Sequence, residues 1–262
     1  MKSRYLARRQ VLKSAAGVAG SLVLSGCDNL SRNDGFRNVL ERTEALTERV
    51  QRALTPRNAL AKEYAESEIS ALFPSNGNSD PGTEEYAELA QQDFAKWRLV
   101  IGGLVLNPVE LSLAALKEMP SRTQITRHDC VEGWSAIGKW TGVPLGDLMH
   151  QVQPMPAARY AVFYCADIDE QGVAYYESMG LEDLYHPQTI LAYELNGKPL
   201  DVPHGAPIRL RFERQLGYKH AKYIMSIKLV DSLVGIGDGK GGYWEDQGYE
   251  WYAGILLLLA RL

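Results

Sequence analysis

The stretch from Arg127 to Leu145 sets the tightest limits on how this chain folds. From Ile125 to Cys130 the side chains alternate in type, which is the period of a β-strand. This alternation predicts that His128 and Cys130 share one face of the strand end. The chain is then expected to leave the strand for a loop, because glycines recur at Gly133, Gly138 and Gly142. A cysteine at a strand end beside such a loop is a suitable place for an exposed, reactive thiolate.

The composition is that of an ordinary globular protein. The 262 residues are 45% hydrophobic and 23% charged, which is enough for one substantial core and a small appendage. The formal net charge of −4 gives no basic surface for nucleic acid, so nucleic acid is not an expected partner. Three cysteines, at positions 27, 130 and 165, do not suggest a disulfide framework, and each needs its own explanation.

Residues 1–26 are interpreted as a targeting segment and are left out of the fold prediction. They hold five basic residues and no acidic one. The run Ala7–Lys13 contains Arg8-Arg9 and resembles a twin-arginine export signal. The apolar stretch Ala15–Leu24 is shorter than the roughly 20 residues that span a bilayer. The alternative is an ordinary amphipathic N-terminus.

The targeting segment ends in Leu24-Ser25-Gly26-Cys27, which resembles a lipoprotein box. The resemblance implies that Cys27 is acylated, which anchors the protein by lipid alone, without a transmembrane helix. Asp28 then favours retention at the inner membrane. The alternative is cleavage without an anchor. We therefore expect a periplasmic protein, exported folded by the twin-arginine route and lipid-anchored to the inner membrane. Folded export is required when a cofactor is inserted in the cytoplasm, so the signal also favours a cofactor.

The rest of the chain is predicted to divide into a helical lead segment with a linker, residues 27–95, and a catalytic domain, residues 96–262. In the lead segment, residues 37–71 carry a patchy apolar stripe that Thr55-Pro56 breaks into two helices. Residues 74–82 are rich in Ser, Asn, Gly and Pro, which is typical of a surface loop. In the catalytic domain we expect strands within 97–105, 125–130, 160–165, 190–195 and 227–230, helices at 111–119 and 145–151, a loop with a short helix at 175–187, and a closing segment at 256–259.

Two short segments, His204–Leu210 and Gly217–Ile224, gather basic side chains in one part of the chain. They supply four candidate hydrogen-bond donors for a phosphate, which are His204, Arg209, His220 and Lys222. Glycines at 205 and 217 allow the backbone to approach a ligand closely. Taken alone, Arg209 and Lys222 are better explained as solvated charges on alternating strands; taken together with Cys130 and the export signal, a ligand site is favoured.

These segments together resemble a known family. Cys-Val-Glu-Gly-Trp-Ser from Cys130 and Trp-Thr-Gly-Val-Pro-Leu from Trp140 resemble the molybdopterin-binding domain of the sulfite oxidase superfamily. The nearest branch contains the catalytic subunit of the periplasmic methionine-sulfoxide reductase. The two basic segments resemble cofactor-pocket segments of the same family, and the resemblance is good over roughly Trp97 to Ser232. It implies an α+β fold with mixed β-sheets, surrounding helices and long loops around a buried cofactor.

The resemblance implies a molybdenum–molybdopterin cofactor and a set of residues that hold it. Cys130 would bind molybdenum through sulfur, as a metal ligand and not as a nucleophile; a thiolate is a soft ligand that suits this metal site. His128 is a hypothetical catalytic residue that hydrogen-bonds the centre if it shares the face of Cys130. The lead segment is expected to cross the catalytic domain and help close the pocket. Further contacts to the cofactor are expected from His204, Arg209, His220, Ala221 and Lys222. Cys165 is a further candidate contact, although on its own it is most simply a small buried hydrophobic residue.

The resemblance also bears on the substrate. Sulfite oxidases carry an arginine pair shortly after the cysteine, where this chain has Trp134 and Ser135. This difference argues against sulfite and favours two-electron oxo transfer on a small neutral molecule such as a sulfoxide. An aromatic tail, Tyr243 to Tyr252, either lines the funnel above the metal or caps the core. Electrons would be exchanged with a separate partner, by resemblance a membrane haem protein or cytochrome.

Two other classes of protein remain as alternatives. One is a hydrolase or transferase in which Cys130 is the nucleophile and His128 the base. It does not account for the folded-export signal or for the basic segments. The other is a non-catalytic binding lipoprotein that has lost the metal, which the presence of Cys130 makes less favoured. The metal content of the purified protein distinguishes all three classes.

Overall fold

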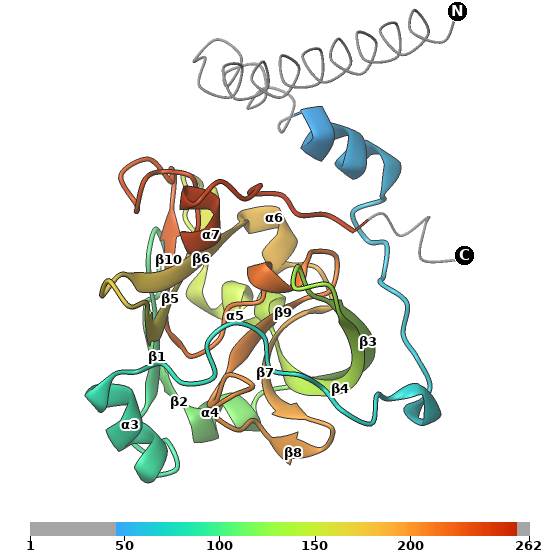
Figure 1. Cartoon of the computed structure of the whole chain (residues 1–262). Coiled ribbons are helices and arrows are strands. Elements are labelled where there is room, and N and C mark those ends of the chain that lie inside the picture. Colours follow the sequence, from blue (N-terminus) through green and yellow to red (C-terminus); the bar gives the residue numbers. More distant parts are fainter. Residues whose placement is uncertain (1–45, 256–262) are drawn as a thin grey trace, which may run out of the picture. The chain divides into compact units, whose positions relative to one another are not determined.

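The computed structural model describes residues 46–255 (Figure 1). The predicted export signal, Cys27 and the closing segment at 256–259 lie outside the described residues. Residues 46–54 form a helix, and one compact unit ends at Ala53. The described residues from Leu54 onward belong to a second unit, which contains both sheets. Of the helices within residues 46–255, none is both long enough and apolar enough to cross a bilayer. The predicted division at residue 96 stays a prediction.

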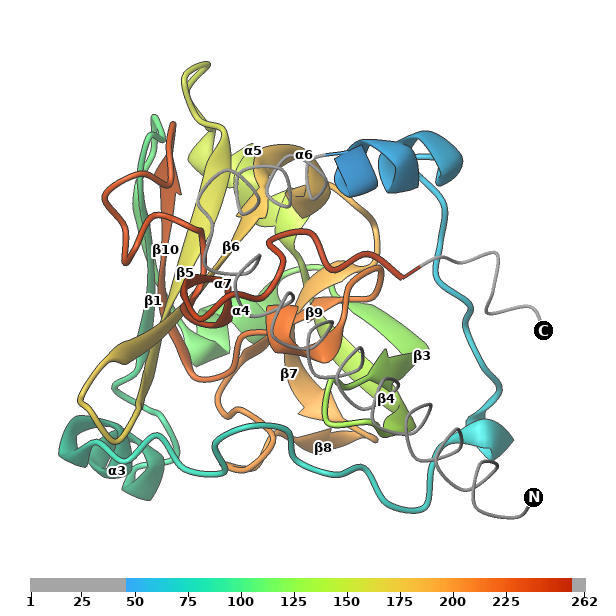
Figure 2. The same ribbon diagram turned by 45° about the horizontal axis from the view of Figure 1, so that its top comes forward.

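Two sheets, the first mixed and the second antiparallel, form the frame of the second unit, as Figures 1 and 2 show. The first sheet has the order β2-β1-β10-β5-β6, and the second has the order β3-β4-β7-β8, with β9 also paired to β7. Strands β1 and β10 run parallel, and the other pairs are antiparallel. The strands are β1 (Arg98–Gly103), β2 (Val109–Ser112), β3 (Arg122–Asp129), β4 (Ser135–Pro144), β5 (Tyr160–Ile168), β6 (Ala174–Gly180), β7 (Thr189–Leu195), β8 (Lys198–Pro199), β9 (Arg209–Phe212) and β10 (Ile224–Val230). The predicted α+β class is confirmed.

Short helices join the strands. Helix α4 follows β2 directly, and the hydroxyl of Ser112 caps it by accepting a hydrogen bond from the backbone N–H of Ala115 at 3.1 Å. The others include α5, which follows β4 without a loop. Besides the helix of residues 46–54, the helical elements are η1 (Glu66–Glu68), α3 (Glu84–Gln91), α4 (Leu113–Glu118), α5 (Leu145–Val152), α6 (Leu181–Leu184), η2 (Gly217–Lys219) and α7 (Tyr243–Asp246).

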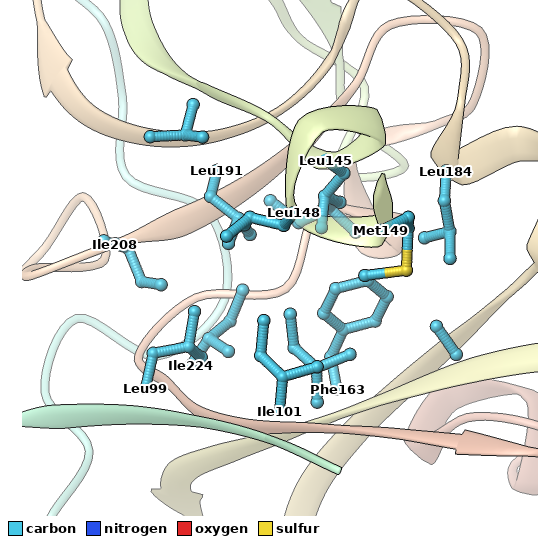
Figure 3. Packing of buried hydrophobic residues seen from close by; sticks show 14 of the residues in the cluster. Leu99, Ile101, Leu145, Leu148, Met149, Phe163, Leu184, Leu191, Ile208 and Ile224 are labelled. Carbon is cyan, nitrogen blue, oxygen red and sulfur yellow. The ribbon is translucent and has the colours of Figure 1, made fainter. Parts of the chain in front are cut away.

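The main core draws side chains from both sheets and from α5. Helix α5 buries residues at the i, i+3, i+4 and i+7 positions of one face, which are Leu145, Leu148, Met149 and Val152. Figure 3 shows this face meeting Leu99 and Ile101 of β1 and Phe163 of β5. Each such buried side chain stabilises the fold by roughly 1.5–3 kcal/mol relative to an exposed one. The core fixes the position of β5, whose far end reaches the candidate site.

The lead segment does cross this unit, but the second of its two predicted helices does not form. Beyond Pro56 the chain is mostly extended, with only η1 as a helical turn. The backbone N–H of Tyr64 donates to the carbonyl of Ile125 at 2.9 Å, and that of Ser70 donates to Ile137 at 3.0 Å. These hydrogen bonds to β3 and β4 take the place of the intrahelical hydrogen bonds that the second predicted helix would have formed. We call residues 56–82 the crossing segment.

Two further predictions of local structure were wrong. Residues 174–180 form strand β6 and not a loop. The sequence did not show this strand because Glu177 and Ser178 are buried in it, at positions where an apolar pattern would place hydrophobic residues. Gly138 and Gly142 lie inside β4 and not in a loop. Glycine is needed at Gly142 because the adjacent strand lies very close: a Cβ there would overlap the backbone of Leu191 in β7.

Candidate functional site

A cavity of about 280 Å³ opens beside Cys130. We call it the Cys130 cavity. Three of the predicted site residues, Cys130, His220 and Lys222, are among its lining residues. The other lining residues come from the crossing segment, the turn after β3, the β5–β6 hairpin, η2 and the region of α7, and are Asn76, Gly77, Asn78, Val131, Glu132, Asp167, Ile168, Asp169, Val173, Tyr175, Tyr218, Tyr243, Trp244 and Tyr249.

Cys130 begins the tight turn that joins β3 to β4. Its backbone N–H donates to the carbonyl of Trp134 at 2.9 Å, and its carbonyl accepts from Gly133 at 3.1 Å. Gly133 has a φ of 90°, which glycine adopts without strain. The thiol is half-buried, and burial raises its pKa above the ordinary value. Without a metal, Cys130 is therefore a protonated thiol and a poor nucleophile, whereas metal binding favours the thiolate.

His128 lies behind the cavity wall. It is fully buried and is not among the lining residues. Its Nδ1 accepts a hydrogen bond from Nη1 of Arg211 at 2.9 Å, which places the proton of the neutral ring on Nε2. Burial, followed by the charge of Arg211, lowers the pKa of His128 far below its usual value. In residues 46–255 no hydrogen bond joins His128 to Cys130. The ring is thus poorly placed to act as the base of a cysteine nucleophile.

The ring of His128 instead supports other parts of the site. It stacks on Trp134, with ring centroids 5.3 Å apart, and meets His220 edge-on at 5.1 Å. A Cβ at Gly217 would overlap the His128 ring, so only glycine lets η2 lie this close. His220, on the cavity side, directs its Nε2 toward the carbonyls of Phe212 at 2.8 Å and Gln215 at 3.2 Å. Its Nδ1 is buried and has no partner in the described structure.

Arg209 is a fully buried cation that lacks a carboxylate partner among the described residues. Its guanidinium donates to the carbonyl of His204 at 3.1 Å and to Oδ1 of Asn76 at 3.2 Å, while Nε has no partner. Burial, together with the charge of Arg211, lowers its pKa to about 9. Because burial of an unpaired charge is costly, the arrangement favours an anion beside Arg209.

Lys222 is the second cation at this site. Its ammonium donates to the carbonyls of Asn78 and Pro203, the latter at 3.0 Å, and it forms no ion pair in residues 46–255. Burial lowers its pKa to about 7, and the charge of Arg209 adds to this effect. Gly205, at a φ of 103°, packs between the two cations: a Cβ there would come within 2.9 Å of Lys222 and 3.2 Å of Arg209.

The remaining predicted contacts do not line the cavity. Cys165 is buried in the core, and burial raises its pKa well above the usual value. The His204 ring lies between Asp201, with Nδ1 to Oδ1 at 2.5 Å, and the carbonyl of Phe73 at 2.9 Å. Ala221 is buried, and its carbonyl accepts from Leu210 at 2.8 Å. Cys165, His204 and Ala221 thus lie beneath the wall of the Cys130 cavity or beside it.

Several lining residues were missed by sequence reasoning. Asn76 and Asn78 lie in residues 74–82, where the composition predicted an ordinary surface loop, yet Asn76 is buried. Glu132 accepts hydrogen bonds from Trp134 Nε1 at 3.0 Å and from Gly77 at 3.1 Å, which tie the crossing segment to the Cys130 turn. Trp134 and Glu132 stand in the same motif as Cys130, and this proximity was the one usable signal.

Apolar side chains surround the mouth of the cavity. We call them the apolar rim; all are at least one-third exposed and all line the Cys130 cavity, and they are Val131, Ile168, Val173, Trp244 and Tyr249. The aromatic tail therefore has both of the roles that were left open. Tyr243, Trp244 and Tyr249 line the cavity, whereas Trp251 packs over Tyr160 and hydrogen-bonds Ser178 at 2.8 Å.

The residues at this site fit molybdopterin. That cofactor carries a phosphate and a ring with several nitrogens, and it brings sulfur ligands of its own to the metal. The cavity has one thiol and one cation, Lys222, in its wall, and Arg209 is buried beside it; among the described residues neither cation is paired with a carboxylate. Buried polar atoms without a partner in residues 46–255 include Nε of Arg209, Nδ1 of His220 and Oδ1 of Asp167. A ligand with anionic and heteroaromatic parts would satisfy these atoms.

Comparisons with known proteins point to the same chemistry. The family model described as the oxidoreductase molybdopterin binding domain matches residues 86–233. An Azospira oryzae protein, provisionally named protein-methionine-sulfoxide reductase subunit YedZ1, is 38% identical over 248 residues, covering 95% of this chain and 88% of that protein. The protein-methionine-sulfoxide reductase catalytic subunit MsrP of Xanthomonas axonopodis pv. citri is 37% identical over 150 residues, covering 53% of this chain but 47% of MsrP. The match thus spans about half of MsrP.

A solved structure with a similar chain is the sulfane dehydrogenase SoxCD from Paracoccus pantotrophus. The alignment has a TM-score of 0.48 and 23% sequence identity, and it covers 53% of this chain and 39% of that chain.

Proposed function

This chain belongs to the oxidoreductase molybdopterin binding domain family, and on that premise we propose that it reduces sulfoxides, with methionine sulfoxide in polypeptides as the substrate class. The protein is a molybdopterin oxidoreductase, and its molybdopterin-binding domain implies a molybdenum cofactor. The names of the Azospira oryzae and Xanthomonas axonopodis relatives support a sulfoxide as the substrate.

The residues of the Cys130 cavity divide the work of holding the cofactor. Cys130 would be the protein ligand to the metal, through its sulfur. Lys222 and Arg209 would hold the phosphate, because a buried cation without a carboxylate gains most from an anion. When bound, the cofactor supplies the two-electron oxygen-atom exchange with the substrate. His128 would keep η2 and the Cys130 turn in register by packing against Trp134 and Gly217.

The substrate is inferred from the mouth of the cavity. The exposed residues that line the cavity are the apolar rim, Gly77, Asn78 and the carboxylate Glu132, and none of them is a cation, so they suit the apolar flanks of a neutral sulfoxide better than a small dianion. Trp134 and Ser135, where an anion-binding pair would be needed for sulfite, are engaged elsewhere: Trp134 stacks on His128, and Ser135 Oγ donates to Asp129 at 2.5 Å. An exposed rim around a narrow cavity admits a side chain while the polypeptide that bears it stays outside.

One observation carries the proposal: the thiol of Cys130 and the ammonium of Lys222 line one cavity together with the apolar rim, and within residues 46–255 neither Lys222 nor the nearby Arg209 is paired with a carboxylate. A nucleophilic cysteine would need a base, and His128 does not reach Cys130. A non-catalytic binding protein would not need a thiol beside uncompensated cations.

We also propose where the protein works and with what. Electrons would come from a separate haem-containing or similar one-electron carrier; the word subunit in the name of the Azospira oryzae relative supports a multi-subunit enzyme. The protein would act in the periplasm, exported folded and held at the inner membrane by acyl chains on Cys27. Labelling with a radioactive fatty acid, in the native protein and in Cys27→Ser, tests the anchor. Label on both proteins would contradict it.

The test of function begins with metal analysis of protein purified from a host that makes molybdopterin. We expect close to one molybdenum per chain, with a fluorescent pterin released on denaturation. The loaded protein should reduce methionine sulfoxide in an oxidised, unfolded polypeptide with reduced viologen as electron donor. It should not oxidise sulfite at a comparable rate.

Two variants sharpen that test. Cys130→Ser should lose sulfoxide reduction by at least about 100-fold and lose metal, because the ligand is removed. Cys165→Ser is the matched control, since this thiol is buried outside the cavity, and it should keep both. Full metal in the native protein with sulfite oxidation and no sulfoxide reduction would refute the substrate class. Absence of metal from a folded, exported protein would refute the oxidoreductase mechanism.

A further inference from the structure

The helix of residues 46–54, drawn in blue in Figure 1, carries an apolar face that is exposed. We call it the lead helix. At about 100° per residue, Leu46, Val50 and Leu54 fall within one narrow arc, and the small Ala53 lies beside them. The three large side chains are 57%, 46% and 56% exposed. A helix of a globular domain turns such an arc toward the core, so this face needs a cover that the described residues do not supply.

The other side of the lead helix is polar. Nε of Arg52 donates to Oε1 of Glu48 at 2.7 Å, which is an ion pair between neighbouring turns, and Gln51 lies on the same side. Arg49 is exposed at the edge of the apolar arc. A helix with aliphatic side chains on one side, charges on the other and an arginine at the boundary is of the type that lies flat in a lipid–water interface.

The distribution of charge along the chain also favours a membrane as the cover. Residues 28–57 hold six arginines and five acidic residues, whereas residues 58–262 hold 17 basic and 27 acidic ones. Anionic lipid headgroups repel a strongly acidic unit, but they do not repel a nearly neutral segment that carries arginines. The surroundings of the lead helix are therefore the part of the chain whose charge suits an anionic bilayer.

A second apolar stretch leaves the described structure close to the point where the lead helix ends. Arg57 follows shortly after the lead helix, and its carbonyl accepts a hydrogen bond from Nη1 of Arg214 at 2.7 Å. The carbonyl of Arg214 in turn accepts from the backbone N–H of Ile255 at 2.9 Å. Four leucines follow in the sequence, at 256–259. The apolar character of this region thus extends beyond the lead helix.

The predicted lipid anchor lies within reach of the lead helix. Cys27 precedes Leu46 by 19 positions, which span at most about 65 Å of extended chain. Acyl chains on Cys27 would hold the lead helix within this distance of the bilayer. Because a tether raises the effective concentration of the helix at the membrane, even a short apolar face is sufficient for binding.

We propose that the apolar face of the lead helix lies in the headgroup region of the inner membrane, as a second contact beside the acyl anchor. This inference goes beyond the proposed sulfoxide reduction and rests on the proposed anchoring at Cys27. Acyl chains alone leave a protein free to turn about its tether. A helix that lies flat at the surface fixes the point from which the crossing segment starts, and so keeps the catalytic unit close to an electron carrier in the bilayer.

The experiment replaces the acyl anchor by a defined tether. The metal-loaded mature chain, with Cys27→Ser and a polyhistidine tag at its start, is held on vesicles of phosphatidylethanolamine and phosphatidylglycerol that contain a nickel-chelating lipid. Hydrogen exchange of the backbone amides of residues 46–54 is compared between free and tethered protein. We expect exchange to slow by at least about tenfold on the vesicles, because contact with lipid stabilises the helix. Phosphatidylcholine in place of phosphatidylglycerol should give less slowing, because the negative charge is lost.

Two variants test whether the apolar face is responsible. The triple variant Leu46→Gln with Val50→Gln and Leu54→Gln removes the face but keeps the helix, since glutamine has a good helix propensity. Its exchange should be the same in the free and the tethered protein. Leu72→Gln is the matched control, because Leu72 is 75% exposed but lies outside the lead helix, and it should behave as native. Both variants should reduce sulfoxide at the native rate, since none of these residues lines the Cys130 cavity.

Other covers for the face give different results, and each of them would overturn the inference. Equal slowing of the native protein and the triple variant means that tethering alone protects the helix. Slow exchange in the free protein that Leu257→Asp with Leu258→Asp relieves means that the leucine run covers the face. Slowing that grows with protein concentration means that a second copy covers it. No slowing on lipid vesicles means that the face binds a protein partner or nothing.

The outcomes are also separate from those of the proposed function. If the loaded native protein reduces no sulfoxide, the proposed function fails and this inference stands. If the native protein takes up no fatty-acid label at Cys27, the anchor and this inference fail together, whereas the proposed reaction is unaffected.

Discussion

Arg209 and Arg211 lie two residues apart on β9, both fully buried and both over the ring of Trp140, at 5.1 and 4.3 Å. Arg211 is held by both oxygens of Glu213, at 2.7 and 2.8 Å. Within residues 46–255, the partners of Arg209 are carbonyl and amide oxygens alone, and its Nε has none. The same residue type, strand and burial thus yield one compensated charge and one that is not.

The difference shows which charge belongs to the fold and which to a ligand. A bidentate pair in the interior is satisfied by itself, and Glu213 also accepts from Gln124 at 2.9 Å. A second compensated cation, Lys219, is bonded by Glu177 at 2.5 Å and by Glu245. Arg209 and Lys222, by contrast, form no ion pair in the part of the chain that the structure describes, which is the arrangement expected where an anionic ligand completes the site.

The largest expected effect is on stability, from breaking the compensated pair. Arg211→Met should lower the free energy of unfolding by about 3–5 kcal/mol, because it leaves Glu213 buried and unpaired. Arg209→Met should cost the cofactor-free protein far less, since no carboxylate loses a partner. Urea denaturation of both variants measures the difference. Equal losses would remove the distinction between the two arginines.

The next effect is on cofactor retention, for which Arg209, and not the compensated Arg211, is expected to matter. Arg209→Gln should release the molybdenum cofactor about 10–100-fold faster than the native protein, because a charge-assisted bond is worth about 1.5–3 kcal/mol. Arg209→Lys should recover part of the retention. Metal content after extended dialysis is the measurement. Arg122→Gln, a partly exposed arginine paired to Glu63, is the control and should retain cofactor normally.

A pH titration separates Lys222 from ordinary lysines. Its pKa is lowered to about 7 in the fold, so between about pH 7 and pH 10 the unfolded chain binds a proton that the folded chain does not. The free energy of unfolding of the cofactor-free protein should therefore rise with pH across this window, by on the order of 2 kcal/mol more than in Lys222→Met. Lys228→Met, an exposed lysine on β10, should match native. Parallel curves for native and Lys222→Met would show that Lys222 is not an uncompensated cation.

The smallest effect concerns the anion itself. Inorganic phosphate at about ten times its dissociation constant should stabilise the cofactor-free protein by about 1.4 kcal/mol. The double variant Arg209→Met with Lys222→Met should show no such stabilisation. Thermal melts at matched ionic strength, with chloride as the comparison salt, make the measurement. Stabilisation of the double variant to the same extent would mean that phosphate acts elsewhere on the protein.

Sequence reasoning succeeded where chemistry and chain position coincide. Cys130 lies in a dense motif, and His220 and Lys222 lie in a second one, so their meeting at one cavity followed from a family resemblance. Strand and helix positions in the core followed from long apolar runs such as Ile190–Leu195 and from the face of α5. These signals are local, because the spacing of apolar residues within each element is enough to identify it.

Sequence reasoning failed where long-range polar contacts decide. Strand β6 was not expected because Glu177 is buried, and only the distant Lys219 makes that burial tolerable. Asp167 gave no signal as a cavity-lining residue, because its place in the wall depends on pairing that shifts register between two strands. Alternation put His128 on the face of Cys130, but the strand ends at Asp129, so the turn separates their surroundings.

The crossing segment has a consequence for how the cavity opens. The carbonyl of Asn78 accepts hydrogen bonds from Lys222 and Tyr223. These bonds join residues that are 144 and 145 positions apart in the sequence. Contacts of such high order are slow to form, since a long chain must first close on itself. This wall is a segment outside both sheets, held by hydrogen bonds and by the buried side chains of Phe73 and Asn76, while the other walls come from the strands, their turns, η2 and the region of α7. We expect partial detachment of this segment, without global unfolding, to be the least costly route by which a bulky cofactor enters.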